Sequence, residues 1–176
     1  MESNMPIKQS LLLEKSASYK EQLNENLRKF AEMGTTKKAF LCHSHQDADM
    51  VKGLIVLLLE YGIELYVDWK DQTMPPSPNK ITAQKNQDKI KSCNLFLYLA
   101  THNSSNSRWC PWEIGYADSN ARKIYIIPTE NYNGTYGNEY LDLYSLIDLS
   151  LSNTKIGLAK FGIGGTNGEW LSSENI

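Results

Sequence analysis

The segment from residue 107 to residue 117 combines a carboxylate with several aromatic side chains. Pro111 fits the first turn of a helix, where its missing amide hydrogen costs little. In such a helix, spacings of three and four residues place five side chains on one face: Trp109, Trp112, Glu113, Tyr116 and Ala117. Burial would raise the pKa of the Glu113 carboxyl group, whereas the helix start would lower it. Glu113 is therefore a candidate functional residue, and the spacing fits equally a carboxylate that only caps the helix or lies at the edge of its apolar face.

Polar residues also follow two other apolar runs, residues 39–42 and 63–69. Ser44, three residues before Asp47, fits a capping box at a helix start. Free amides at a helix start also attract phosphate groups. Asp68 closes the second run, where it could accept hydrogen bonds from a ribose or simply begin a turn.

A metal site made of Cys42, His43 and His45 is not expected. Adjacent side chains of a strand point to opposite faces, and no second Cys/His pair supplies the missing ligands. Phosphate-loop and nucleophile-elbow motifs are missing from the sequence, and the glycines of residues 162–165 do not open a strand-to-helix turn.

The overall composition excludes several classes of partner. The 176 residues carry 18 Lys and Arg against 20 Asp and Glu, a net charge of −2. Nucleic acid and anionic membranes are therefore not expected as partners. No run approaches the ~20 apolar residues of a membrane helix, and the N-terminus lacks the pattern of a secretory signal. Three scattered cysteines fit a reducing compartment, so we expect a cytoplasmic protein.

Strand-like and helix-like segments alternate from residue 38 to residue 150. Apolar runs typical of strands occur at 39–42, 63–69, 95–100, 123–127 and 145–149. Helical patterns between them end at Gly62 or span about 79–92 and about 109–121. Alternation at about 30 residues per unit predicts an α/β fold with a central parallel five-stranded sheet and helices on both faces. Such sheets bind ligands at the carboxyl ends of their strands, which is where the candidate residues lie.

Residues 1–36 precede this domain and are predicted to form a helical extension. Apolar side chains recur in it at steps of seven, four, four and three residues: Leu12, Tyr19, Leu23, Leu27 and Phe30. An isolated helix cannot bury such a stripe, so we expect it to pack against its own domain, with a partner protein as the alternative. Residues 37–153 form the predicted domain, and residues 154–176 a C-terminal helix or tail that packs on the domain or flanks it.

Three segments, in this order, resemble the Toll/interleukin-1 receptor (TIR) family. They are A-F-L-C-H-S-H at 39–45, K-I-K-S-C-N-L-F-L-Y-L at 89–99 and S-R-W-C-P-W-E at 107–113. The last matches the S-x-W-C-x-x-E segment of the family and is the most specific, and the resemblance covers about residues 38–150. Pro75 and Pro76 stand where many receptor-type members have an Arg-Asp-x-x-Pro-Gly loop, and no third box follows. The chain is therefore similar to bacterial members, such as those of Thoeris-like anti-phage systems, rather than to animal adaptors.

This resemblance implies a flavodoxin-like TIR fold and an enzyme. Enzymatic TIR domains cleave the bond between nicotinamide and ribose in NAD⁺ with one glutamate of this helix, which here is Glu113. The resemblance places Trp109 on the nicotinamide side, Ser44 and His45 near the ribose or diphosphate, and Asp68 on a hydroxyl. NAD⁺ is then a substrate, and neither another cofactor nor a metal is expected.

The implied activity is that of an NAD⁺ glycohydrolase or ADP-ribosyl cyclase that makes an ADP-ribose-type signal. It implies self-association through the TIR domain and a separate effector that senses the product. A non-catalytic adaptor that acts through homotypic contacts is the alternative, and it would keep the fold without needing Glu113. A phospho-receiver of similar topology would need an acidic pair at the end of the first strand, where this chain has Cys42, His43 and Ser44.

Overall fold

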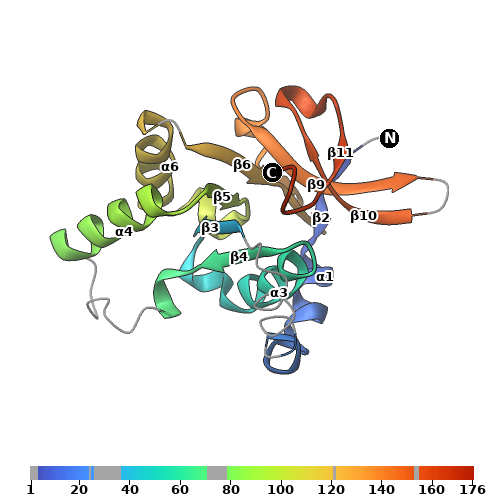
Figure 1. Cartoon of the computed structure of the whole chain (residues 1–176), viewed down its shortest axis with the longest axis horizontal. Coiled ribbons are helices and arrows are strands. Elements are labelled where there is room, and N and C mark those ends of the chain that lie inside the picture. Colours follow the sequence, from blue (N-terminus) through green and yellow to red (C-terminus); the bar gives the residue numbers. More distant parts are fainter. Residues whose placement is uncertain (1–3, 24, 26–36, 71–78, 121, 153–154) are drawn as a thin grey trace.

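The computed structural model describes residues 4–23, 25, 37–70, 79–120, 122–152 and 155–176 (Figure 1). Five strands of one sheet run parallel: β3 Lys37–Cys42, β4 Ile63–Tyr66, β5 Leu95–Leu99, β6 Lys123–Ile127 and β9 Ser145–Ser152. Their order across the sheet is β4-β3-β5-β6-β9. This is the flavodoxin-like order, in which the second of the five parallel strands, β4, lies outside the first, β3. The predicted α/β fold with a parallel five-stranded sheet is confirmed.

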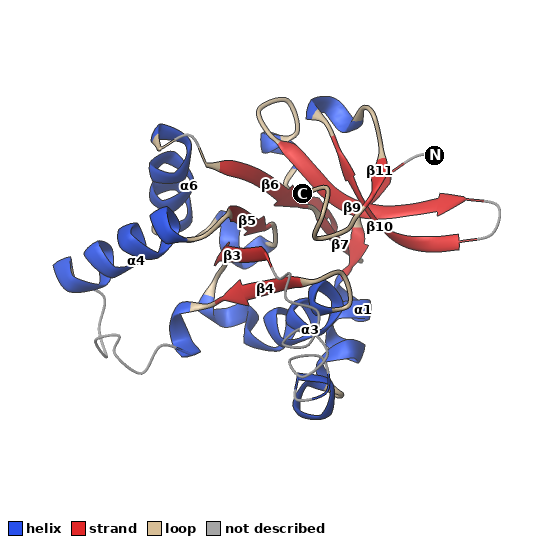
Figure 2. Cartoon of the chain, in the orientation of Figure 1, coloured by secondary structure: helices blue, strands red, loops and turns tan. Residues whose placement is uncertain are grey.

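Helices cover both faces of the sheet (Figure 2). One face carries α1 Gln9–Ser16 and α3 Ala48–Leu59, and the other carries α4 Lys80–Ser92 and α6 Cys110–Ser119. The side chains of β3 alternate between these two cores, because Leu41 packs under α3 whereas Phe40 and Cys42 pack under α6. None of the described helices is long and apolar enough to cross a membrane.

Strand β4 is shorter than the apolar run 63–69 predicts. After Tyr66 the chain leaves the sheet, and residues Asp68–Lys70 form the 3-10 turn η2. The Asp68 carboxylate accepts a hydrogen bond from the backbone N–H of Trp69 at 2.7 Å. Bonds of this local kind compete with strand pairing, so Asp68 begins a turn at the carboxyl end of the strand.

The residues after 154 extend the sheet as strands, and none of those described lies in an α-helix. β10 Lys155–Phe161 pairs antiparallel with β9, and β11 Glu169–Trp170 pairs antiparallel with β10. At the other end of the chain, β1 Asn4–Met5 also pairs with β9. The sequence predicted a helix or tail here, because the glycines of this segment obscure the buried apolar residues of β10, Leu158, Ala159 and Phe161. The division of the chain at residues 36/37 and 153/154 stays a prediction.

A second, small sheet consists of β2 Ile7–Lys8, β7 Thr129–Asn131 and β8 Gly134–Tyr136. Strands β7 and β8 form an antiparallel hairpin. Asn133 and Gly134 are typical turn residues, and they lie at the tip of this hairpin, where Asn131 pairs with Gly134.

The N-terminal extension packs against its own domain through α1. A Cβ atom on Gly53 of α3 would lie 1.8 Å from the carbonyl oxygen of Leu12, so only glycine permits this approach of the two helices. Leu12 is fully buried, and Tyr19 and Leu23 pack partly buried against the same core. This part of the predicted apolar stripe therefore contacts the domain, as expected.

The predicted N-terminal helix is interrupted. α1 ends at Ser16, residues 17–18 form a turn, and residues 19–23 are helical again. Leu27 and Phe30 of the predicted stripe lie outside the described residues, as does the Pro-rich stretch 75–78.

Candidate active site

A pocket of about 490 Å³ opens at the carboxyl ends of the parallel strands. Its walls come from η1 His45–Asp47, η2, α4, α5 His102–Ser105 and the start of α6. It lies near the point where the strand order reverses between β3 and β5, which is the usual ligand position in this topology. The structure brings together all five residues that the sequence predicted for the site: Ser44, His45, Asp68, Trp109 and Glu113.

Glu113 forms a buried wall of this pocket and is 6% exposed. Its backbone N–H donates to the carbonyl oxygen of Trp109 at 2.9 Å, and its Oε1 accepts a hydrogen bond from Asn86 Nδ2 at 2.8 Å. Burial raises the pKa of Glu113 to about 8, against the lowering effect of hydrogen bonds from Cys42 and Asn86. Burial and the helix start act in opposite directions on the pKa of Glu113, and burial has the larger effect. At pH 7 the carboxyl group is therefore mostly protonated.

Trp112 and Tyr116 of α6 lie on a different side of the helix from Glu113. Trp109 meets Trp112 edge-on at 5.4 Å between ring centroids, and Trp112 stacks on Tyr116 at 6.0 Å. The buried side of the helix consists of Cys110, Glu113, Ile114 and Ala117. The predicted single face of two indoles, a phenol and a carboxylate is wrong, because Trp112 and Glu113 are turned by about 100° from each other. Of the three aromatic residues, Trp109 at the N-cap is the one that shares the pocket with Glu113.

Ser44 caps the turn η1 without the predicted capping box. Its Oγ accepts a long hydrogen bond, 3.4 Å, from the amide two residues later. The Asp47 carboxylate is buried and accepts hydrogen bonds from Thr101 Oγ1 and Asn103 Nδ2, each at 2.6 Å. Asp47 therefore anchors the start of α5 beside the pocket instead of returning a bond to Ser44.

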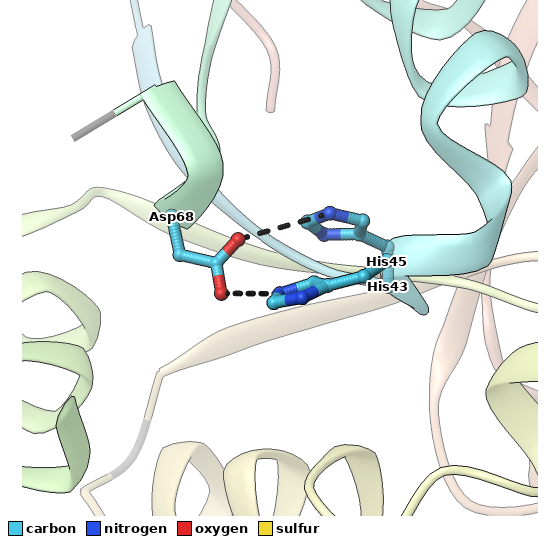
Figure 3. Close-up of side chains that lie close together, drawn as sticks. All are labelled: His43, His45 and Asp68. Atoms are coloured by element: carbon cyan, nitrogen blue, oxygen red, sulfur yellow. Dashed lines mark hydrogen bonds and ion pairs between the residues drawn. The ribbon is translucent and has the colours of Figure 1, made fainter. Parts of the chain in front are cut away.

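His43 and His45 point toward Asp68 along one side of the pocket (Figure 3). His45 Nε2 lies 2.8 Å from Asp68 Oδ2, and His43 Nε2 lies 3.9 Å from Asp68 Oδ1. The His43 ring is fixed on both sides, because its Nδ1 lies 3.0 Å from the carbonyl oxygen of Leu41 and its Nε2 accepts from the indole N–H of Trp69 at 3.1 Å.

These contacts set different charge states in the three side chains. Burial lowers the pKa of His43, so this imidazole is neutral. The hydrogen bond with Asp68 raises the pKa of His45. Burial opposes ionisation of Asp68, but its hydrogen bond with His45, the electrostatic effect of the two nearby imidazoles and the Trp69 N–H outweigh that effect and lower its pKa. The pocket thus holds a carboxylate paired with His45 and, in Glu113, a carboxyl group that favours its neutral form.

A family model described as TIR domain matches residues 39–155 of this chain. The chain belongs to the TIR domain family. The probable 3′ cyclic ADP-D-ribose synthase ThsB′ of Bacillus cereus strain MSX-D12 is 36% identical over 113 residues, which cover 61% of this chain and 58% of the relative. The CMP N-glycosidase BcmB of Clostridium botulinum, a solved structure, is 27% identical with a TM-score of 0.40, over 51% of this chain and 67% of that chain. The resemblance to TIR domains is confirmed, and the match spans a little over half the length of ThsB′.

His43, His45 and Asp68 of this TIR domain also form a group that could hold a metal ion. One ligand atom each of His43, His45 and Asp68 lies within 4.8 Å of the others. An ion bound there would take the place of the Trp69 indole N–H at His43 Nε2. It would also have to lie between His45 Nε2 and Asp68 Oδ2, which are now in direct contact. Asp68, and not Cys42, completes the group, because Cys42 points into the core under α6. The expectation of no metal stays a prediction.

Sequence reasoning missed two residues of α4, Thr82 and Asn86, which line the TIR pocket. The lysines of this helix indicate a solvated face, but Thr82, Asn86 and Ile90 are buried. Steps of four residues place these three on one side of the helix. This four-residue spacing could have indicated a buried side of the helix. It is a weak signal, because only Ile90 of the three is apolar.

Proposed function

We propose that this TIR-domain protein cleaves the bond between nicotinamide and ribose in NAD⁺, as a glycohydrolase or an ADP-ribosyl cyclase. The observation that carries the proposal is the buried Glu113 carboxyl group in a pocket of about 490 Å³, with Trp109 beside it. The name of the Bacillus cereus relative, a probable 3′ cyclic ADP-D-ribose synthase, supports the same class of reaction.

A single carboxyl group is chemically sufficient for this cleavage. Ordinary glycosidases need a second, acidic group because their leaving group is poor. Nicotinamide leaves as a neutral molecule from a positively charged ring, so no proton has to be supplied. The remaining demand is to stabilise the positive charge that develops on the ribose, which a preorganised carboxylate in a dry site does effectively. Glu113 meets that demand. Water in a glycohydrolase, or a hydroxyl group of the ADP-ribose itself in a cyclase, then bonds to the anomeric carbon and gives up a proton.

NAD⁺ would itself bring Glu113 into the required charge state. The pKa of Glu113 is about 8 because the carboxyl group is buried. A pyridinium cation placed beside the carboxyl group favours the ionised form and lowers the pKa. Substrate binding would therefore generate the catalytic carboxylate, since each partner stabilises the charge of the other.

The other pocket residues would bind the rest of the dinucleotide. The Trp109 ring would contact the nicotinamide, and an aromatic ring also attracts a cationic one. His45, whose pKa is raised by Asp68, supplies positive charge near the amides after Ser44 for the diphosphate or ribose. Asp68 keeps lone pairs available for a ribose hydroxyl, although it is already paired with His45.

The product in this account is an ADP-ribose-type signal, and the name of the Bacillus cereus relative favours a cyclic one. We further propose that the protein makes it in the cytoplasm during bacterial anti-phage defence, and that a separate effector senses it. Self-association through the TIR domain would assemble the active form. Neither nucleic acid nor a membrane has a role in this account.

Chromatography of the reaction products tests the proposal. The purified chain is incubated with NAD⁺ at high protein concentration with a crowding agent, which favours assembly. We expect nicotinamide release by the wild type and by the control Glu139→Gln, whose exposed side chain lies outside the pocket. Glu113→Gln should release nicotinamide at least about 100-fold more slowly while its circular dichroism spectrum is unchanged.

Two results would count against the proposal. If the wild type released no nicotinamide under assembling conditions, the non-catalytic adaptor would be the better account. If Glu113→Gln retained the wild-type rate, the reaction would stand and the assignment of Glu113 would be wrong.

A further inference from the structure

Asn86 of α4 has a buried amide group that is satisfied on one side only. The side chain is 2% exposed and lines the same pocket as Glu113. Its Nδ2 donates to Glu113 Oε1 at 2.8 Å, whereas its Oδ1 is buried and has no hydrogen-bond partner. Both atoms belong to one planar amide, so the unpaired oxygen lies within a few ångströms of the Glu113 carboxyl group.

The start of α4 fixes the direction in which Asn86 points. Asn79 Oδ1 accepts hydrogen bonds from the N–H groups of Ile81 and Thr82, at 2.8 and 3.2 Å, and Thr82 Oγ1 accepts from the N–H of Asn79 at 3.2 Å. This capping box sets the helix, and Thr82, Asn86 and Ile90 then share its buried side. The hydrogen bond from Nδ2 to Glu113 fixes the plane of the amide, and the position of the Oδ1 atom is therefore fixed as well.

An unpaired carbonyl oxygen in a protein interior is costly, by about 1–3 kcal/mol. In the described part of the chain, two other buried side-chain atoms lack a partner, Asp148 Oδ1 and Ser150 Oγ, and both belong to β9. Of these three residues, Asn86 is the one that lines the pocket holding Glu113. A hydrogen-bond donor on a bound ligand would satisfy its oxygen.

We propose that Asn86 is a substrate-contacting residue that links Glu113 to the nucleotide: its Nδ2 orients the Glu113 carboxylate, and its Oδ1 accepts a hydrogen bond from a hydroxyl of the ribose that loses nicotinamide. The inference rests on the proposed function and adds a recognition site to it. The ribose is the part of the substrate that must lie against Glu113, so its hydroxyls are the donors within reach of the neighbouring amide oxygen.

The same contact tunes the ionisation of Glu113. The described groups that act on Glu113 are Cys42 from β3, Cys110 from its own helix, Asp68 from η2 and Asn86 from α4. Burial raises its pKa most, Cys110 and Asp68 raise it further, and the hydrogen bonds from Cys42 and Asn86 lower it. Removal of the Asn86 donor therefore raises the pKa of Glu113, and the ionised form is reached only at higher pH.

Two substitutions at this position distinguish the contribution of the donor atom Nδ2 from that of the acceptor atom Oδ1. Asn86→Leu removes both the donor and the acceptor, whereas ionised Asn86→Asp keeps an oxygen at the acceptor position, removes the donor and adds a negative charge that also raises the pKa of Glu113. Asn138→Asp, an exposed change outside the pocket, is the control. For each variant, KM and kcat for nicotinamide release are measured across pH, and the Glu113 titration is followed by its infrared carboxyl band, assigned by difference from Glu113→Gln.

Both variants should shift the Glu113 titration and the rise of kcat/KM to higher pH. Asn86→Leu should also raise KM about ten-fold, with a clearly smaller increase in Asn86→Asp. With NAD⁺ analogues that lack the 2′- or the 3′-hydroxyl on the nicotinamide ribose, the KM ratio of Asn86→Leu to wild type should fall towards one for one of the two analogues. An unchanged ratio with both would overturn the assignment to a hydroxyl of this ribose.

A folded Asn86→Leu protein with wild-type KM and wild-type Glu113 titration would overturn the inference as a whole. Because the infrared titration does not need turnover, it tests the link between Asn86 and Glu113 even if wild-type protein cleaves no NAD⁺. Absence of turnover with a shifted titration would thus contradict the proposed function and retain the link.

Discussion

Glu113 and Asp148 are two buried carboxyl groups with similar immediate surroundings. Burial raises the pKa of Glu113 to about 8 and that of Asp148 to about 7. Each accepts a hydrogen bond from an asparagine side chain, Glu113 from Asn86 at 2.8 Å and Asp148 from Asn4 at 3.1 Å. In each pair one buried oxygen is left without a partner, Asn86 Oδ1 in the first and Asp148 Oδ1 in the second.

The positions of the two groups in the sheet are different. Glu113 projects from α6 at the carboxyl ends of parallel strands, where a pocket of about 490 Å³ meets it. Asp148 lies within β9, opposite Ala159 of the antiparallel strand β10, and is not among the residues that line this pocket. A raised carboxyl pKa therefore reports burial, and it indicates a functional site only where the group also meets a cavity that a ligand can enter.

The largest expected difference between the two carboxyl groups is in catalysis. Glu113→Gln should slow nicotinamide release at least about 100-fold, because the charge that stabilises the ribose cation is lost. Asp148→Asn keeps the shape of its side chain and should leave the rate unchanged. Initial rates of both variants, measured side by side, test this difference, and an equal loss in Asp148→Asn would show that the effect is not specific to the carboxyl group in the pocket.

In stability, by contrast, the two carboxyl groups should behave alike. Each has a folded-state pKa above its unfolded value, so the stability it contributes is complete at low pH and is lost as pH rises through about 8 for Glu113 and about 7 for Asp148. Glu113→Gln and Asp148→Asn should each stabilise the protein at about pH 9 by on the order of 3 kcal/mol, with little change near about pH 3, where both carboxyl groups are protonated in the folded and the unfolded chain. Urea unfolding at the two pH values measures this, and a wild-type stability that does not fall with pH would contradict it.

The ion pair of Asp68 and His45 gives the smallest effect, and its removal should destabilise the protein instead of stabilising it. The pKa of Asp68 is lowered and that of His45 is raised, so the stability from this pair is lost as pH rises through the raised pKa of His45 and as pH falls through the lowered pKa of Asp68. The His45 side chain is 65% exposed, so His45→Gln should cost less than about 1 kcal/mol at pH 6 and nothing at pH 9. Thermal melts at both pH values test this. An equal cost at both would show that the ion pair does not contribute.

The parallel sheet and the position of Glu113 could be predicted from the sequence because their signals are local. The run Leu95–Leu99 is apolar throughout and becomes the buried strand β5. Pro111 and the residues after it mark the helix that carries Glu113. The sequence could not decide between burial and the helix start in setting the pKa of Glu113, because that balance depends on what packs against α6.

The contacts of Glu113 and Asp68 could not be predicted from the sequence. Asn86 lies 27 residues before Glu113, in a helix whose lysines indicate a solvated face. His43 meets Asp68 only because β3 and β4 are neighbours and the chain turns after Tyr66. The strand β10 has few buried apolar residues and several glycines nearby, so its pairing with β9 has no strong local signal.

The dependence of kcat/KM on pH, with NAD⁺ as substrate, shows whether the ionised Glu113 carboxyl group drives the cleavage, because this ratio reports the ionisation of the free enzyme. We expect kcat/KM of the wild type to rise with pH about a midpoint near 8, and Glu113→Gln to lose this rise together with the activity. A wild-type profile that is flat across this range, or that falls as Glu113 ionises, would contradict this role of Glu113.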